Sequence, residues 1–292
     1  MHTPDGFITG WICFLLLSLS ALPVILALRN LGRSMTRQKA LTLGVVAAVI
    51  FMAQMLNFPI GSGTSGHLLG GALALIVLGV DGAVVVMATV LLVQALVFGD
   101  GGIMSLGANI FNMAIAGVYT ADLAYRRLPV SGNVRIFSIA LFSVAAASAA
   151  CAIELAASGT APLLEVLRAM TLTHIIIGSG EGLLTIALAG IFASRLDGLT
   201  LRTALTASGI SFLALALALP FTSGSPDGLE SVAINLGFFG KAISIYAAPL
   251  QDYSLAISWG LPYLATLSAA LAGSAIVFVI PQLMIRPTSL PS

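Results

Sequence analysis

Only three residues of this chain are histidines, and one of them is the second residue. The sequence begins Met1-His2, so the free amine of Met1, the amide of His2 and its imidazole can bind one metal ion together. The two chelate rings, five- and six-membered, share the amide nitrogen and hold the three donors near one plane. Tetragonal nitrogen ligation suits Cu(II) or Ni(II) better than tetrahedral zinc or the oxygen cages of Ca²⁺. A fourth nitrogen is expected from His67 or His174.

This chelate requires Met1 to keep an unmodified amine, which is the usual outcome when a bulky residue follows. The stretch "GSGTSGHLLGG" around His67 has five glycines in eleven residues. Glycine lets the backbone approach closely and adopt positive φ, so this loop can dip into a helical bundle and present His67. The alternatives are a flexible exterior loop and a histidine at a helix start in the membrane interface.

His174 and Glu181 are seven residues apart, so they share one face of a helix. An ionisable residue inside a membrane span is by default a functional candidate. Glu181 is expected either to orient a ligand or to be a hydrogen-bonded structural carboxyl, and His174 is either a ligand or a buried core histidine. Asn57 and Ser65 are further candidates for supporting the ligands or for ion access.

The composition excludes a water-soluble domain. Hydrophobic residues make up 59% of the chain and charged residues 8%, whereas soluble domains have about 25% charged residues. The net charge of +1 predicts no basic face for nucleic acid, so the expected environment is a lipid bilayer. Cys13 and Cys151 lie in apolar runs and are predicted to be small buried residues.

Apolar runs long enough to span a bilayer recur along the chain. The sequence therefore predicts an all-α, polytopic membrane protein with about nine transmembrane helices. The run at 67–80 is short and follows the glycines, so a broken or re-entrant helix is expected there. The nine predicted segments are 8–28, 40–57, 67–80, 82–98, 103–125, 134–157, 170–193, 201–219 and 262–285.

The basic residues predict which end of each helix faces the cytoplasm. With the N-terminus outside, all of the 12 Lys and Arg residues except Arg168 and Lys241 fall on the cytoplasmic side. Nine crossings then place the C-terminus in the cytoplasm. The three histidines all fall at or near the outer face.

Two parts are expected, a metal-binding part at 1–197 and an accessory part at 198–292. The second part has two helices that flank a polar outer loop at 220–260. This loop is expected to contact the glycine-rich loop and to help it open and close. Its carboxylates, Asp227, Glu230 and Asp252, are hard oxygen donors and are expected to be dispensable for binding nickel.

Three motifs, "MHTPDGF" at the start, "NFPIGSGTSGHLLGG" at 57–71 and "HIIIGSGEGLLT" at 174–185, resemble signatures of the CbiM/NikM family. These proteins are the substrate-binding components of energy-coupling factor (ECF) transporters for cobalt and nickel. "SPDGLE" at 225–230 and "DYS" at 252–254 resemble a fused NikN-type component. Thr3 and Gly61-Ser62 depart from the family pattern without removing a ligand.

The resemblance implies that Ni²⁺ or Co²⁺ is the transported substrate, held by Met1, His2 and His67, with His174 in a supporting or access role. It implies two kinds of partner in a prokaryotic inner membrane: a CbiQ/NikQ-like transmembrane coupling subunit and CbiO/NikO-like cytoplasmic ATPases. The chain has no G-x-x-x-x-G-K-[ST] motif, so no enzyme activity of its own is expected.

Two other classes of function were weighed against this one. An intramembrane metalloenzyme would need an open metal position and a general base, for example in H-E-x-x-H, and the sequence has no such motif. A stand-alone secondary transporter would be expected to show inverted repeats and membrane-embedded charges. No repeat is visible, and Glu181 is the one clearly central carboxylate.

Overall fold

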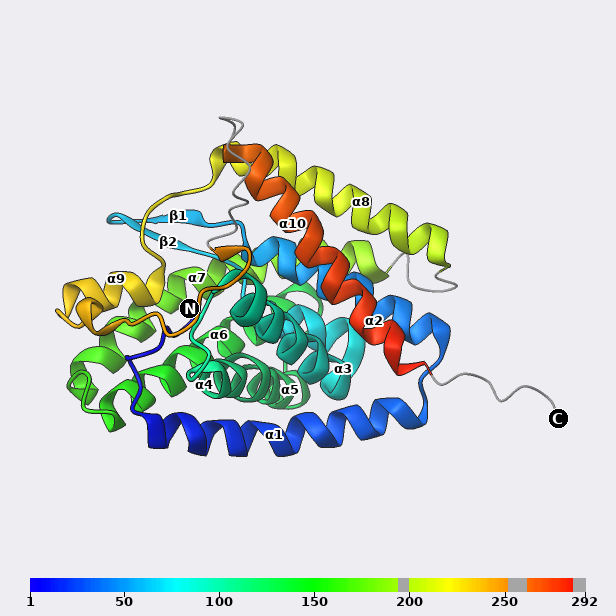
Figure 1. The fold of residues 1–292 in the computed structure, drawn as a ribbon. Coiled ribbons are helices and arrows are strands. Elements are labelled where there is room, and N and C mark those ends of the chain that lie inside the picture. The colour runs from blue at the N-terminus through cyan, green and yellow to red at the C-terminus, as the bar shows by residue number, and fades with distance from the viewer. Residues whose placement is uncertain (194–199, 252–261, 286–292) are drawn as a thin grey trace.

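The computed structural model describes residues 1–193, 200–251 and 262–285, which form a bundle of long helices (Figure 1). The α-helices are α1 (Gly10–Arg33), α2 (Arg37–Gln54), α3 (Gly71–Val93), α4 (Leu106–Ile110), α5 (Gly117–Arg127), α6 (Gly132–Ala157), α7 (Leu163–Ala193), α8 (Leu201–Ala218), α9 (Gly228–Asn235) and α10 (Pro262–Val279). The π-helical segments are η1 (Gln94–Phe98) and η2 (Phe111–Ala116). The 3₁₀ segments are η3 (Leu219–Phe221), η4 (Phe239–Lys241) and η6 (Ile280–Met284). The strands β1 (Phe58–Gly61) and β2 (Thr64–Gly66) pair as an antiparallel hairpin.

Within the described ranges, six helices are long and apolar enough to cross a membrane. They cover Gly10–Arg33, Gly71–Phe98, Gly132–Ala157, Leu163–Phe192, Leu201–Phe221 and Thr266–Met284. This confirms the predicted all-α, multi-pass class. Each of the nine predicted segments contains helix, and α4, η2 and α5 form one continuous run.

The helix α3 reverses direction at Gly79, whose φ of 71° and ψ of 179° are not helical. Gly70, just before α3, packs on Ile50 in the second half of α2, whereas Gly82, after the reversal, packs near Leu43 in its first half. The following segment η1 returns to the end of α2, where a glutamine pair joins the two. The segments predicted at 67–80 and 82–98 therefore form a helical hairpin, because glycine alone tolerates the conformation at position 79.

The first nine residues are extended and fixed along their length. Asp5 accepts hydrogen bonds from the backbone N–H groups of Ile103 and Ser105, at 3.1 and 3.0 Å. It also forms an isolated β-bridge with Ile243. Gly6 has a φ of 92° and lies against the carbonyl of Lys241, so a side chain has no room there. The start of the chain is thus held between the loop before α4 and the segment after α9.

The C-terminal part packs on the first part at two places. α8 and α10 lie along α2, and Gly273 of α10 leaves room for the ring of Phe51. The short helix α9 lies on α7, and Figure 1 places α9, the β-hairpin and the N-terminus toward the same end of the bundle. The expected boundary at 197/198 and the carboxylate Asp252 lie outside the described residues.

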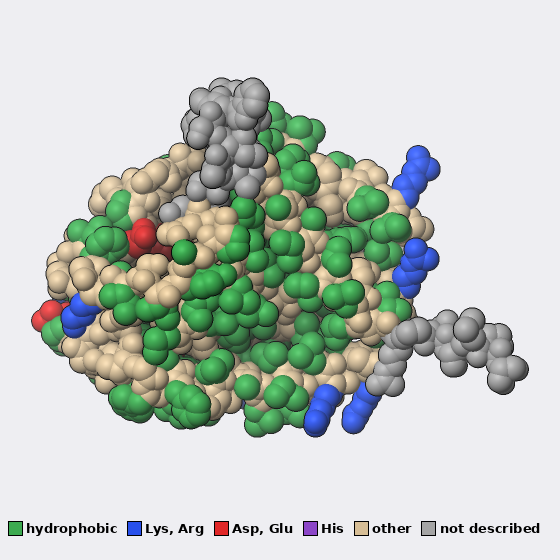
Figure 2. All heavy atoms as spheres, viewed as in Figure 1, with side chains coloured by type: hydrophobic (Ala, Val, Ile, Leu, Met, Phe, Trp, Pro, Cys, Tyr) green, Lys and Arg blue, Asp and Glu red, His purple; other side chains and the backbone are tan. Residues whose placement is uncertain are grey.

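The surface is divided by residue type along the long axis of the bundle. In Figure 2, hydrophobic side chains cover the middle, and most of the visible Lys and Arg side chains gather at the end away from the N-terminus. These basic residues stand at the C-terminal ends of α1 and α5 and at the N-terminal ends of α2, α6 and α8. The apolar middle is therefore the region that lipid would surround.

Candidate metal centre

The amine of Met1 lies in a buried polar contact between the two parts of the chain. Its nitrogen is 2.7 Å from Nε2 of His67 and 2.8 Å from Oδ2 of Asp227, and Met1 is 3% exposed. The same carboxylate oxygen is 3.8 Å from Nε2 of His67. Two of the predicted ligand groups are therefore neighbours, and a carboxylate of the accessory part touches both.

Nε2 of His67 faces this amine, and in the neutral ring it is the unprotonated nitrogen. Nδ1 of the same ring donates to the carbonyl of Leu68 at 2.9 Å, which leaves the lone pair on Nε2. Nitrogen ligands lie about 2.0 Å from metals such as zinc, so two nitrogens at adjacent corners of a metal plane are about 2.8 Å apart. The observed separation of 2.7 Å between the amine and Nε2 is close to that value.

The glycine-rich loop is a β-hairpin, a detail that the sequence analysis did not predict. Its turn uses positive φ at Gly61, Ser62 and Gly63, as the backbone twist of tight hairpins favours. Ser65 is fully buried; its Oγ donates to the carbonyl of Ser225 at 2.7 Å and its N–H to that of Pro226 at 2.8 Å. The predicted contact between the segment 220–260 and this loop is confirmed.

Asn57 stands at the base of the hairpin and contacts the same segment. Its carbonyl accepts the N–H of Ser223 at 2.8 Å. Its side-chain oxygen is buried and has no hydrogen-bond partner among the described residues. Among the described residues no hydrogen bond joins Asn57 to a histidine, so Asn57 lies beside the loop rather than among the expected ligand groups.

Glu181 holds the chain that follows His67. Its Oε2 accepts the N–H of Leu69 at 2.7 Å and its Oε1 that of Gly70 at 3.0 Å, and the side chain is completely buried. These bonds fit both roles expected for Glu181, that of a hydrogen-bonded structural carboxyl and that of a group that orients the ligand two residues before Leu69. Non-helical backbone at membrane depth needs such partners, because lipid offers none.

His174 is fully buried and makes no hydrogen bond to Met1, His2 or His67 in the described part of the chain. α7 begins at Leu163, so His174 is deeper along the helix than the predicted start at 170 implied. Its Nδ1 donates to the carbonyl of Met170 at 2.8 Å. Its Nε2 is buried with no hydrogen-bond partner in the described part of the chain and faces Gly228, where a Cβ would come within 3.2 Å of it.

The imidazole of His2 stacks on that of His67, with ring centroids 5.4 Å apart and an interplanar angle of 15°. Its Nδ1, the atom that would close the chelate ring, is 3.1 Å from Oδ1 of Asp100. Its Nε2 is 3.1 Å from Oε1 of Gln94. Burial lowers the pKa of His2 to about 4, although Asp100 opposes that shift.

Three polar neighbours of these groups lie outside the expected ligand set: Asp100, Gln94 and Asp227. Burial by itself would raise the pKa of Asp227, but the Met1 amine and His67 outweigh it and hold that pKa well below its ordinary value. Asp227 also begins α9 in a reciprocal capping box with Glu230. The D-x-x-E spacing in "SPDGLE" is the signal that would have found this cap.

The described residues contain no group of three His, Cys, Asp or Glu side chains arranged to hold a metal ion. The nitrogen site expected from the sequence uses the main-chain amine and amide as well as imidazoles, so this finding does not bear on it. Cys13 and Cys151 are free and buried, as predicted.

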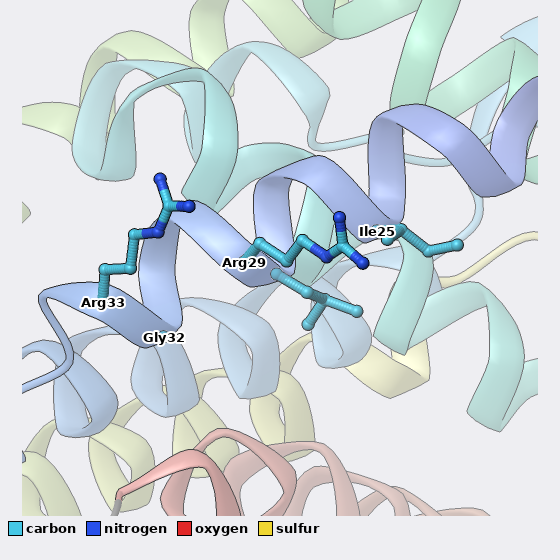
Figure 3. Close-up of a pocket in the computed structure, with 5 residues that line it drawn as sticks. Ile25, Arg29, Gly32 and Arg33 are labelled. Carbon is cyan, nitrogen blue, oxygen red and sulfur yellow. The ribbon is translucent and has the colours of Figure 1, made fainter.

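A separate groove of about 490 Å³ lies at the C-terminal end of α1 (Figure 3). It is lined by the apolar side chains of Ile25 and Leu28, by Arg29 and Arg33, and by Gly32. A positively charged groove repels a metal dication, and the groove is at the opposite end of α1 from Met1. It is therefore no part of the metal centre.

Known proteins with similar sequences and folds are metal transporters. The model of the CbiM family, a cobalt uptake substrate-specific transmembrane region, matches residues 2–199. The chain is 38% identical to a putative fused nickel transport protein NikMN of Archaeoglobus fulgidus, across 96% of each chain. It is 29% identical to the fused nickel transport protein NikMN of Rhodobacter capsulatus, across 95% of each.

Solved structures agree with this assignment. A truncated transition metal transporter superposes with a TM-score of 0.59 and 28% identity, over 66% of this chain and 99% of that one. A second transition metal transporter gives a TM-score of 0.58 at 27% identity, over 70% of this chain and 98% of the other. The chain therefore belongs to the CbiM family of membrane proteins and carries a fused NikN-type part after the family region.

Proposed function

We propose that this protein is the membrane substrate-capture subunit of an ATP-driven ECF importer and that Ni²⁺ or Co²⁺ is its substrate. The observation that carries the proposal is the 2.7 Å separation of the Met1 amine and Nε2 of His67, which are 66 positions apart in the sequence. The names of the relatives, which are nickel and cobalt transport proteins, support the choice of ions.

The proposed ligands are the amine of Met1, the amide and Nδ1 of His2, and Nε2 of His67, in one plane. Nitrogen donors suit nickel and cobalt, with nickel modestly favoured at a given site. On binding, the ion would replace the direct contact between Nδ1 of His2 and Asp100. It would also lie between the Met1 amine and Nε2 of His67, which both stay as ligands. The carboxylates of Asp100 and Asp227 then lie near a dication, where their charge is favourable.

We place the N-terminus and this site at the outer face of a prokaryotic inner membrane and the C-terminus in the cytoplasm. The grouping of Lys and Arg at the far end of the bundle supports this orientation, because cytoplasmic loops carry an excess of both (Figure 2). The chain has no phosphate-binding loop for ATP. The ATPases and the coupling subunit expected from the family resemblance would therefore supply the energy.

The C-terminal segment acts in this proposal as the cover of the site. Ser65 binds two carbonyls of that segment, and Thr64 Oγ1 lies 2.7 Å from Oγ of Ser231. With the ion pair between Met1 and Asp227, these contacts join the hairpin and the amine to one short helix. Ion uptake into the site must break some of them.

The test is metal analysis of the purified full chain, with Met1 as the first residue, after exposure to Ni²⁺ and Co²⁺. About one ion per chain is expected, and a planar nickel complex should be diamagnetic. His67→Ala should abolish loading while the protein stays folded in detergent. Unchanged loading of His67→Ala would show that the site lies elsewhere.

A transport measurement separates the importer from a stand-alone transporter. Vesicles that hold the full chain together with a coupling subunit and ATPases should accumulate ⁶³Ni²⁺ when ATP is supplied. Vesicles with the chain alone should bind the ion without accumulating it. Accumulation by the chain alone would refute the ATP-driven mechanism.

A further inference from the structure

Two buried glutamines connect His2 to the loop that carries His67. Gln54 Nε2 donates to the carbonyl of Leu69 at 2.6 Å, and Gln94 Nε2 donates to Oε1 of Gln54 at 2.7 Å. Oε1 of Gln94 then faces Nε2 of His2 at 3.1 Å. Gln54 is 3% exposed and Gln94 is fully buried, so water does not compete for these bonds.

The carbonyl of Leu69 fixes the donor and acceptor of every hydrogen bond in this series. A backbone carbonyl can only accept, so Gln54 must turn its NH₂ group toward Leu69 and its oxygen toward Gln94. Gln94 must then turn its NH₂ group toward Gln54 and its oxygen toward His2. An amide oxygen can only accept, so Nε2 of His2 must carry a proton, whether the ring is neutral or charged.

We infer that Gln94 and Gln54 are positioning residues that keep a proton on Nε2 of His2 and so reserve Nδ1 for the metal ion. This inference rests on the proposed function, since Nδ1 is the atom that closes the six-membered chelate ring with the amide nitrogen. The opposite tautomer, with the proton on Nδ1, would bind the ion only through Nε2, which is too far around the ring for that chelate.

The glutamines act against Asp100. Its Oδ1 lies 3.1 Å from Nδ1 of His2 and favours a proton there. The other neutral tautomer of His2 would require both glutamine amides to turn over. The oxygen of Gln54 would then face the carbonyl of Leu69, which now lies 2.6 Å from Nε2 of Gln54. In the favoured neutral tautomer, Nδ1 and the carboxylate face each other with lone pairs, an arrangement that a dication between them relieves.

The chain of bonds also ties the two histidine segments together. Leu69 accepts from Gln54 through its carbonyl and donates to Glu181 through its N–H. Gln94 is the first residue of the π-helical segment η1, a feature often found at functional sites. A shift of the hairpin is therefore transmitted to the ring of His2 through two side chains.

The proton position can be measured directly, because the full chain contains only three histidines. Histidine labelled with ¹⁵N in its ring is incorporated, and the rings are assigned with the variants His67→Ala and His174→Ala. In the metal-free protein near neutral pH, His2 should show a protonated Nε2. Gln94→Met should move the proton to Nδ1, whereas Gln94→Glu, which keeps an oxygen acceptor, should leave it on Nε2.

The binding assay uses the same proteins and titrates Ni²⁺. Gln94→Met and Gln54→Met should weaken binding by about 10–100-fold, the usual effect of removing a partner of a metal ligand. Gln94→Glu should bind more tightly than Gln94→Met. The control is Gln282→Met, which removes a comparable amide bond to the carbonyl of Ala40 at the other end of the bundle and should leave binding unchanged.

The outcomes separate this inference from the proposed function. A protonated Nδ1 and bare Nε2 of His2 in the metal-free protein would overturn the role of the glutamines, even if nickel binds well. An unchanged proton position and unchanged binding in Gln94→Met would overturn it as well. A protonated Nε2 that depends on Gln94, in a protein that binds neither ion, would support the glutamine role and refute the metal function.

Discussion

Replacing Glu181 by glutamine should weaken metal binding by about 10–100-fold without unfolding the protein. Glu181 accepts the N–H groups of Leu69 and Gly70 with its two oxygens, at 2.7 and 3.0 Å. A glutamine has one oxygen and one NH₂ group, so it can accept one of these bonds while its NH₂ group opposes the other donor. The backbone that follows His67 would then lose one of its two hydrogen bonds to this side chain of α7.

The magnitude follows from the bond that is lost. A hydrogen bond to a charged group is worth about 1.5–3 kcal/mol, and about 1.4 kcal/mol corresponds to a tenfold change in affinity. In the metal-free variant the loop gains freedom, and binding must order it again, so the cost falls on the binding step. The range corresponds to roughly 10–100-fold in Kd.

The assay is titration of Ni²⁺ or Co²⁺ into the full chain in detergent, with thermal unfolding measured in parallel. Glu154→Gln is the matched control, because Glu154 is also a buried carboxylate, bound to Nδ2 of Asn112 at 2.8 Å, without contact to the loop. The control should bind metal as the unmodified protein does. A Kd for Glu181→Gln within twofold of the unmodified value would refute the reasoning, and so would an equal loss in Glu154→Gln.

Three further predictions concern the ligands and the cover. An uncleaved extension before Met1 should abolish metal loading, because it converts the amine to an amide, whereas the same tag at the C-terminus should not; equal loading of both tagged proteins would contradict this. His174→Ala should weaken loading by about 10–100-fold, against complete loss in His67→Ala; equal losses would make His174 the fourth ligand. Asp227→Asn keeps the cap of α9 but removes the charge 2.8 Å from the amine, so it should alter the rates of metal binding and release, measured by stopped flow, more than deletion of the Glu230 carboxyl does.

Much of the fold and of the site was predictable, because lipid leaves few alternatives to helices. Apolar runs located the membrane helices, and glycine content marked a closely packed loop before His67, although not its hairpin form. The chelate geometry predicted Met1 and His2 as one site with either His67 or His174, and the family resemblance implied His67; the structure brings Met1, His2 and His67 together. His174 and Glu181 were correctly placed on one helix.

Other features depend on tertiary contacts that no local pattern contains. The pairing of Gln54 with Gln94 arises because α3 folds back at Gly79, which brings η1 to the end of α2. Asp227 was expected to be dispensable for nickel binding because carboxylates are hard ligands, which stays a prediction, whereas its ion pair with the Met1 amine was not predicted. Its contact with Met1 spans 226 positions and joins the two expected parts of the chain, a pairing that no local pattern indicates.

The buried polar side chains near the site serve the backbone of the ligand segments. Asn109 binds both the N–H and the carbonyl of Thr3, at 2.8 and 3.1 Å, and Glu181 and Gln54 bind the backbone after His67. Each of these side chains thereby satisfies non-helical backbone that lipid could not. Such side chains are poor transient ligands for an ion that crosses the protein. Each one that turned to bind the ion would leave a buried backbone group unpaired, at a cost of about 1–3 kcal/mol. This arrangement agrees with the proposed function, in which the protein captures its ion at one end and partner subunits drive the transfer step, and it argues against a channel that conducts the ion.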